Sequence, residues 1–227
     1  LMLIGPTLMK TRLGVDEVVT TLLLNFIVLL FVQMMLEGVL KDPMSMGWPQ
    51  SEPIIDSAVF PPLIERMRVH FGLIIALVSA IALAVFVKRT VWGFEIRAVG
   101  ENAAAAKFAG ISVTKTMILV AALSGGLAGL AGVAEVAGTR GYLATDLSPG
   151  YGYAGIVVAM LARLSPVGVI ASALFVASVF VGADSMSRAI GVSSYLADLI
   201  VAMALLCVLI GGFLTRFTVH FDRKTAG

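Results

Sequence analysis

Residues 18–40 read VVTTLLLNFIVLLFVQMMLEGVL, a stretch in which Glu37 is the only charged side chain. A transmembrane helix needs about 20 apolar residues, because that length covers the roughly 30 Å hydrocarbon layer of a bilayer. Further stretches of this kind follow at residues 70–87, 116–138, 166–183 and 196–214. The sequence therefore predicts an all-α fold, a polytopic bundle of about five full transmembrane spans.

A sixth apolar stretch, residues 151–161, is too short to cross a bilayer alone. It lies between Ser148-Pro149-Gly150 and a second turn-forming segment that ends at Pro166. We expect either a half-helix or the end of a longer helix that begins in the preceding loop. Non-helical backbone at membrane depth is tolerated only where protein or a water-filled cavity covers it.

The composition agrees with a lipid environment. Apolar residues make up 59% of the chain and charged residues 13%, against about 25% charged residues in soluble domains. The net charge of +2 is too small to indicate nucleic-acid binding. Cys207 is the single cysteine, which excludes a disulfide scaffold and a cysteine-rich metal site. We expect no metal or cofactor, and we interpret residues 1–227 as a single transmembrane domain that is part of a longer protein.

Lysine and arginine predict the orientation, because cytoplasmic loops carry the excess of both. If residues 88–115 form a cytoplasmic loop, residues 41–69 form an external loop and the C-terminus is cytoplasmic. The cytoplasmic segments then hold eleven basic residues: Lys10, Arg12, Lys88, Arg89, Arg97, Lys107, Lys115, Arg163, Arg216, Arg223 and Lys224. The external segments hold five: Lys41, Arg66, Arg68, Arg140 and Arg188. The predicted location is the cytoplasmic membrane, with multiple passes.

Motifs for enzymatic chemistry are absent from the sequence or out of context. Residues 150–155, GYGYAG, satisfy GxGxxG, but a dinucleotide site needs a preceding strand and an acidic residue about 20 positions later. No GxxxxGK[ST] or HExxH motif occurs. The chain is therefore predicted not to be an enzyme.

Polar residues inside membrane spans are candidates for a solute pathway, because they are costly in hydrocarbon unless they face a cavity or a partner. Asn25 lies well inside its span, where lining a cavity and forming an interhelical hydrogen bond are equally good interpretations. Glu135 follows a glycine-rich stretch and lies close to the outer surface. We add Tyr151, Gly152 and Tyr153 of the short stretch as pathway candidates.

The loop at residues 88–115 contains an alanine-rich segment with high helix propensity. Asn102 suits the N-cap and Gly110 suits the C′ position, which predicts a helix of about two turns. We expect Ala105 and Ala106 to present small side chains to a partner, with Gly100 and Gly110 providing turns on either side. An interfacial helix resting on lipid headgroups is the alternative from the residues alone.

The run GFEIRAVGEN at residues 93–102, followed by Ala105-Ala106 and AGI at residues 109–111, resembles the coupling loop of ABC importer permeases of the ribose and simple-sugar family. The similarity is greatest to the nucleoside-transport branch and extends over residues 13–182. Ala103 stands where the family often has proline, and the amino-terminal helices of the family are missing from this sequence. Other matching segments are GVDEV at residues 14–18, TLLLN at 21–25, LSGGLAG at 123–129, EVAG at 135–138 and GYGY at 150–153.

The resemblance implies an importer built from several chains. Two permease chains would form the pathway, two cytoplasmic ATP-binding subunits would hydrolyse ATP, and an external solute-binding protein or lipoprotein would deliver the solute. The mechanism would be alternating access, with a nucleoside as the favoured solute and a simple sugar next. The residues implied in coupling to the ATPase are Arg97, Gly100, Asn102, Ala105, Ala106 and Gly110.

Two other classes of membrane protein compete with the importer. An ion- or proton-coupled secondary transporter would explain Asn25 and Glu135 without an ATPase, but it explains the capped loop helix poorly. A structural or assembly protein would have neither a solute cavity nor a nucleotide-dependent state. A soluble partner chain with a GxxxxGK[ST] motif would favour the importer.

Overall fold

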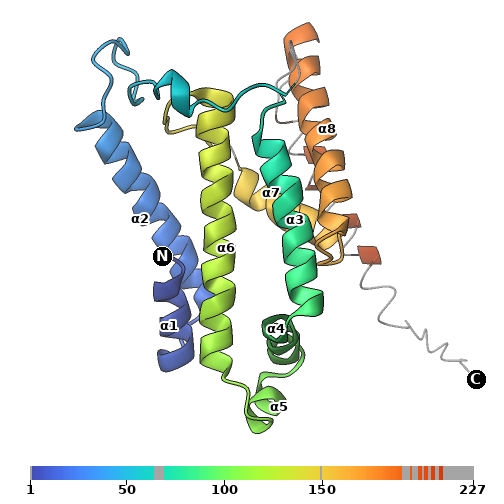
Figure 1. Cartoon of the computed structure of the whole chain (residues 1–227). Helices are drawn as coiled ribbons and strands as arrows, with labels where there is room; N and C mark the ends of the chain where they lie inside the picture. The colour runs from blue at the N-terminus through green and yellow to red at the C-terminus, as the bar shows by residue number, and fades with distance from the viewer. Residues whose placement is uncertain are drawn as a thin grey trace, which may run out of the picture. The chain divides into compact units, whose positions relative to one another are not determined.

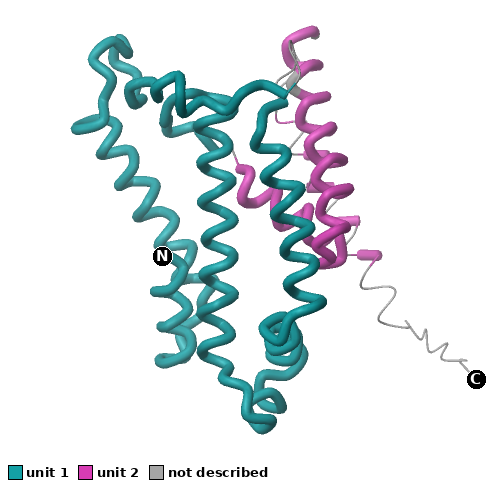
Figure 2. Tube along the Cα trace, in the orientation of Figure 1, with its two compact units in different colours: residues 1–149 teal, residues 150–227 magenta. Residues whose placement is uncertain are grey.

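The computed structural model describes residues 2–63, 69–148 and 150–190, with scattered positions between 195 and 211. The described residues form helices without extended strands, which confirms the predicted all-α class (Figure 1). The chain separates into two compact units, residues 1–149 and 150–227 (Figure 2). The elements are α1 (Ile4–Leu13), α2 (Glu17–Glu37), η1 (Asp56–Ala58), α3 (Gly72–Arg89), α4 (Val91–Glu101), α5 (Ala103–Phe108), α6 (Val113–Glu135), η2 (Val136–Arg140), α7 (Tyr151–Leu161) and α8 (Gly168–Ile190).

The first unit begins with a helical hairpin of α1 and α2. Gly14 ends α1 in the left-handed conformation, φ 68°, and its N–H donates to the carbonyl of Lys10. The carboxylate of Asp16 then caps α2 by accepting from the N–H of Val18 at 2.8 Å. An ion pair between Lys10 and Glu17 closes the turn. The reversal between the helices is thus determined by local chemistry at both helix ends.

Three helices of the first unit are long and apolar enough to cross a membrane. They are α2, α3 and the continuous segment Val113–Arg140, in which α6 runs into η2. Their positions confirm the spans predicted at residues 18–40, 70–87 and 116–138. In Figure 1 they run up, down and up, so that residues 38–63 and η2 lie at one end while α4 and α5 lie at the other.

The loop that follows α2 is held to the end of α6 by hydrogen bonds. The N–H of Ser51 donates to the carbonyl of Leu143 at 2.9 Å, and the N–H of Ile54 donates to the carbonyl of Gly141 at 2.8 Å. The N–H of Phe60 reaches the carbonyl of Ala137 at 2.8 Å. These bonds use backbone groups that would otherwise lack partners, because residues 136–141 leave the α-helical pattern through a π-helical turn.

His70 is inserted between the start of α3 and the end of α6. Its Nδ1 accepts from the N–H of Gly72 at 3.1 Å, and its Nε2 lies 3.4 Å from the hydroxyl of Thr139. A Cβ atom added at Gly138 would stand 2.6 Å from the imidazole Cγ, and one at Gly72 would stand 2.6 Å from Cε1. Two glycines therefore form the slot that holds the His70 ring.

The second unit contains α7 and α8. The short helix covers residues Tyr151–Leu161, where the sequence predicts it, and its eleven residues rise about 16 Å. Gly150 precedes it in the left-handed conformation, φ 78°, so the helix does not continue from the preceding loop. Of the two predictions for this stretch, a half-helix or the end of a longer helix, the half-helix is confirmed. Val157 of α7 and Val176 of α8 form the buried core of the described part of this unit.

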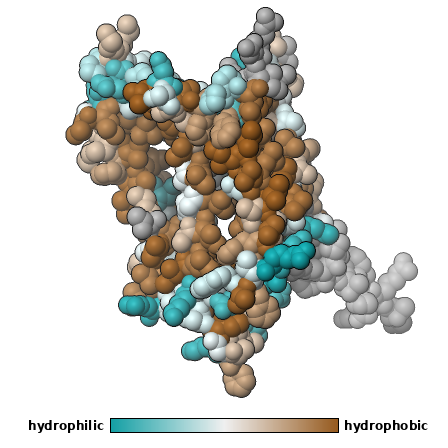
Figure 3. Space-filling model, in the orientation of Figure 1, coloured by the Kyte–Doolittle hydropathy of each residue, from teal (hydrophilic) through white to brown (hydrophobic). Residues whose placement is uncertain are grey.

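The fourth long apolar helix is α8, of which Gly168–Ala189 qualifies as a span and matches the prediction at residues 166–183. The span predicted at residues 196–214 lies largely outside the described residues. The membrane-length helices keep most of their apolar side chains exposed, and the α2 window has none buried. Figure 3 shows this hydrophobic surface over the helices, with hydrophilic residues gathered at their ends. Such a surface suits lipid or other transmembrane chains.

Basic residues separate to the two ends of the first unit as predicted for an oriented membrane protein. The end with α4 and α5 holds Lys10, Arg12, Lys88, Arg89, Arg97, Lys107 and Lys115. At the opposite end the described residues include Lys41 and Arg140. This asymmetry favours the α4–α5 end as cytoplasmic.

Accessibility of introduced cysteines tests this orientation. In full-length protein free of other cysteines, Met44→Cys should react with an impermeant thiol reagent added to intact cells, because Met44 is 88% exposed on the loop predicted to be external. Lys107→Cys should react only after permeabilisation. Labelling of position 107 in intact cells would reverse the orientation.

Candidate functional site

The best-defined site is the capped helix at the end of the first unit. In α5 (Ala103–Phe108), the side-chain oxygen of Asn102 accepts from the N–H groups of Ala104 and Ala105, both at 3.0 Å. Gly110 follows the helix with φ 87°, and the N–H of Ile111 donates to the carbonyl of Ala106 at 2.9 Å. The predicted two-turn helix, its N-cap and its terminal glycine are all confirmed.

The segment before α5 is also helical, which corrects the sequence interpretation. Gly100 was expected to provide a turn, but it lies in the last turn of α4 (Val91–Glu101) and its φ is not positive. The change of direction occurs at Asn102, which is extended with φ −157° and ends α4 while capping α5. The sequence correctly predicted the start of α5 at Asn102 but did not predict that α4 would run up to it.

A tight corner joins α4 to the membrane-length helix α3. The hydroxyl of Thr90 accepts from the N–H of Gly93 at 3.0 Å and donates to the carbonyl of Phe86 at 2.7 Å. The guanidinium of Arg97 donates to the carbonyl of Val87 at 2.8 Å. The carbonyl of Phe86 also accepts from the N–H of Thr90 at 3.2 Å, so the Thr90 hydroxyl adds a second bond at the end of α3, while Arg97 supplies a partner to a carbonyl of the last helical turn. Arg97 thus ties α4 directly to α3.

Gly93 lets this corner close. A Cβ atom at this position would overlap the carbonyl oxygen of Val87 and stand 2.5 Å from that of Phe86. Both obstacles are backbone atoms, which cannot rotate away as a flexible side chain can. The corner between α3 and α4 therefore has little freedom to bend.

The two alanines of α5 face different surroundings. Ala105 is exposed, as expected for a residue that meets a partner. Ala106 is 4% exposed, so in this chain its side chain is covered rather than presented on the surface. Residues at consecutive helix positions point about 100° apart, and only one of the two can lie on a given face. Ala106 instead packs the helix onto the rest of the unit.

Phe108 is the functional candidate that the sequence interpretation missed. It occupies the last position of α5 and is 97% exposed, in a segment outside the predicted spans. Aromatic side chains are among the residues that most often anchor a protein partner, which makes this exposed ring a candidate contact. The available signal was an aromatic residue at the end of an alanine-rich loop helix.

The proposed pathway residues are divided between the two units. Asn25 is exposed near the middle of α2, and no hydrogen bond joins its amide to another described residue. Glu135 ends α6 at the opposite end from α5, so it is not brought together with Asn25. Tyr151, Gly152 and Tyr153 form the first turn of α7 in the second unit, where both tyrosines are exposed, at 49% and 63%.

Comparison with known proteins identifies the sequence relationships of this chain. The family described as "Branched-chain amino acid transport system / permease component" matches residues 4–209. No solved structure matches the chain significantly.

Three curated relatives are similar over most of the chain. The glucose ABC transporter permease protein TsgB13 of Haloferax volcanii is 35% identical over 96% of this chain and 60% of its own length. The guanosine ABC transporter permease protein NupP of Bacillus subtilis is 34% identical, over 89% and 59%. The nucleoside ABC transporter permease protein NupB of Lactococcus lactis is 33% identical, over 81% and 52%. The chain thus spans little more than half the length of these relatives.

Two glycines of α4 provide a matched test of the α3–α4 corner. Gly93→Ala should destabilise the protein by about 1–3 kcal/mol, because the added methyl group overlaps rigid backbone. Gly100→Ala should leave stability unchanged or raise it, since nothing lies within 4 Å of the added Cβ and alanine favours helix. Thermal unfolding in detergent measures both. Equal midpoints for the two variants would contradict the tight corner.

Proposed function

The chain belongs to the family of branched-chain amino acid transport system permease components, and from this premise we propose that it is the transmembrane permease subunit of an ABC importer. The observation that carries the proposal is α5, a helix capped at both ends and presented at the end of the first unit that is richer in basic residues. In this proposal a separate cytoplasmic ATP-binding subunit docks on α5. The capping residues Asn102 and Gly110 hold the helix in place for docking.

Force from the ATPase would pass through a short series of contacts. Ala105 and Phe108 would contact the ATP-binding subunit, while buried Ala106 fixes α5 to the permease. Arg97 and the corner at Gly93 would carry the displacement from α4 into α3. Rearrangement of packed spans would then expose the pathway alternately to each side of the membrane.

The proposed cargo is a small polar solute, with a nucleoside favoured and a simple sugar next. Two similar proteins carry guanosine or nucleoside in their names, and one carries glucose. Asn25, Glu135, Tyr151, Gly152 and Tyr153 are the proposed pathway residues. Amide and phenol groups can hydrogen-bond solute hydroxyl groups, and aromatic rings can stack on a base.

The proposed assembly contains further chains. A second permease chain would complete the pathway, and its contact surface would lie among the exposed apolar faces of the membrane-length helices. An external solute-binding protein or lipoprotein would deliver cargo to the opposite end from α5. The proposed location is the cytoplasmic membrane with a cytoplasmic C-terminus.

Substitution of Phe108 tests the docking surface. Phe108→Ala in the full-length protein with its partners should weaken binding of the ATP-binding subunit about thirtyfold or more, as expected for loss of an aromatic anchor. Uptake and copurification of the subunit should fall together. Phe31→Ala is the control, because Phe31 is 53% exposed on the membrane-length helix α2. Normal copurification and uptake by Phe108→Ala would refute docking through α5.

The energy source separates the importer from a secondary transporter. In proteoliposomes that contain all subunits, uptake should require ATP inside the compartment equivalent to the cytoplasm and should continue when ion gradients are collapsed. Gradient-driven uptake without ATP would support the secondary transporter instead.

A further inference from the structure

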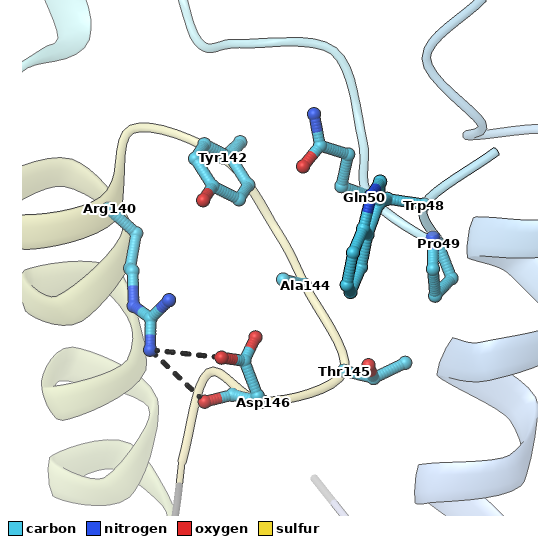
Figure 4. A pocket seen from close by; sticks show the side chains of 8 residues that line it. All are labelled: Trp48, Pro49, Gln50, Arg140, Tyr142, Ala144, Thr145 and Asp146. Carbon is cyan, nitrogen blue, oxygen red and sulfur yellow. Dashed lines mark hydrogen bonds and ion pairs between the residues drawn. The ribbon is translucent and has the colours of Figure 1, made fainter. Parts of the chain in front are cut away.

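An open hollow of about 580 Å³ lies at the outer end of the first unit (Figure 4). One wall is the turn at residues 48–50 of the external loop, and the other is the segment at residues 140–146 that follows α6. This volume is in the range of small-molecule sites, about 300–1,000 Å³. The hollow is separate from α5, which lies at the opposite end of the unit.

The walls of the hollow are held in place by hydrogen bonds. The carboxylate of Asp42 accepts from the N–H of Met44 at 2.8 Å, and the N–H of Trp48 donates to the carbonyl of Ser45 at 3.0 Å, so the turn that carries Trp48 is ordered. Ser51 joins the walls, because its hydroxyl accepts from the N–H of Leu143 at 2.9 Å. The hollow is therefore formed before any ligand binds.

The two walls present different chemistry. The Trp48 indole is 73% exposed, in a loop that is ordered by hydrogen bonds. In Figure 4 it stands on one side of the hollow, with the Arg140 and Asp146 side chains on the other. The guanidinium of Arg140 lies 3.3 Å from the carboxylate of Asp146, whose side chain is 68% exposed. Gln50 and Tyr142 add amide and phenol groups to the lining.

We propose that this hollow is an external binding site for a ring-shaped solute with neighbouring hydroxyl groups. The ring would stack on Trp48, since the indole face accepts bases and the apolar faces of sugars. The Asp146 carboxylate has about four lone-pair positions and uses only part of them on Arg140, so it can accept from two adjacent hydroxyls. Arg140 would hold that carboxylate in position and donate to the solute.

This site extends the proposed function by providing a place where solute is held at the outer face. The choice of nucleosides and sugars as ligands rests on that proposed function, whereas binding itself requires neither the ATPase nor α5. Ribose and pyranose sugars both carry a pair of adjacent hydroxyl groups, so the chemistry of the hollow does not distinguish nucleosides from simple sugars. The binding experiment below compares the two ligand classes.

The test measures equilibrium binding to the purified full-length permease in nanodiscs, without partner proteins. Adenosine is the first probe, 2′,3′-dideoxyadenosine lacks the hydroxyl pair, and glucose represents the sugars. Wild-type protein should bind adenosine. The dideoxy analogue should bind with an affinity at least about tenfold lower, because it leaves Asp146 without its hydroxyl partners. Glucose binding of equal strength would assign the site to polyhydroxylated rings in general.

Variants locate the binding signal in the hollow. Trp48→Ala should weaken adenosine binding about fivefold or more through the loss of stacking, and Trp48→Phe should retain most of it. Asp146→Asn should reduce the discrimination against the dideoxy analogue. Trp92→Ala is the matched control, because Trp92 is 51% exposed on α4 at the other end of the unit. Phe108→Ala should bind as the wild-type protein does, even if coupling fails.

Several results would overturn this site. Undetectable binding of all three probes by the wild-type protein is one, and unchanged adenosine binding by Trp48→Ala is another, since the signal would then come from elsewhere in the permease. If Trp48→Ala lost uptake but kept adenosine binding, the hollow would serve as a contact surface for an external protein rather than as a solute site. A failure of ATP-driven uptake alone would count against the importer and leave this site standing.

Discussion

Hydrocarbon cannot hydrogen-bond to the backbone, and this constraint determines what the chain can form. Every N–H and C=O inside the bilayer must find a partner within the protein, which leaves helices as the form available to these apolar stretches. The constraint relaxes at the helix ends, where water and other segments supply partners. The distinctive features of the first unit occur there: the capped turn at Asp16, the α3–α4 corner and the π-helical turn at η2. Side chains and loops complete hydrogen bonds at these ends, and the candidate sites lie beside them.

The two ends of the first unit are constructed differently. At the end with α4 and α5, small residues and local caps make compact helices that change direction at single residues, Thr90 and Asn102. At the opposite end, a long loop is joined to the segment after α6 by backbone hydrogen bonds between residues far apart in the sequence, such as Ser51 and Leu143. The first arrangement would suit the proposed transmission of a displacement, because helices meet there at tight corners. The second suits a preformed hollow, because its two walls are bonded to each other.

Sequence patterns predicted the structural features that depend on a single segment of the chain. Span positions follow from hydropathy, and α5 follows from the preferences of Asn102 for the N-cap and Gly110 for positive φ. The features that depended on two segments were missed or misread. Gly93 is required by the position of the Val87 carbonyl, and His70 occupies a slot made by glycines 66 residues apart in the chain, Gly72 and Gly138. The contact of Gly93 with Val87 and the pairing of Gly72 with Gly138 follow no sequence period, so one sequence alone does not predict them.

Ala106, expected on the surface of α5, is buried, and Phe108, which the sequence interpretation did not consider, is exposed. Burial therefore has to be known before a coupling surface is assigned. Small residues permit close approach, but the property is the same whether the approaching surface is a partner or the chain itself. In α5 the chain itself covers Ala106, whereas the Phe108 ring two positions later is exposed and is the proposed contact for the ATP-binding subunit. An acidic substitution at Ala106 would therefore place a charge inside the permease and loosen α5 from it. A loss of transport in that variant would reflect disturbed packing of α5 against the rest of the unit. Phe108 is exposed, so its substitution leaves that packing intact.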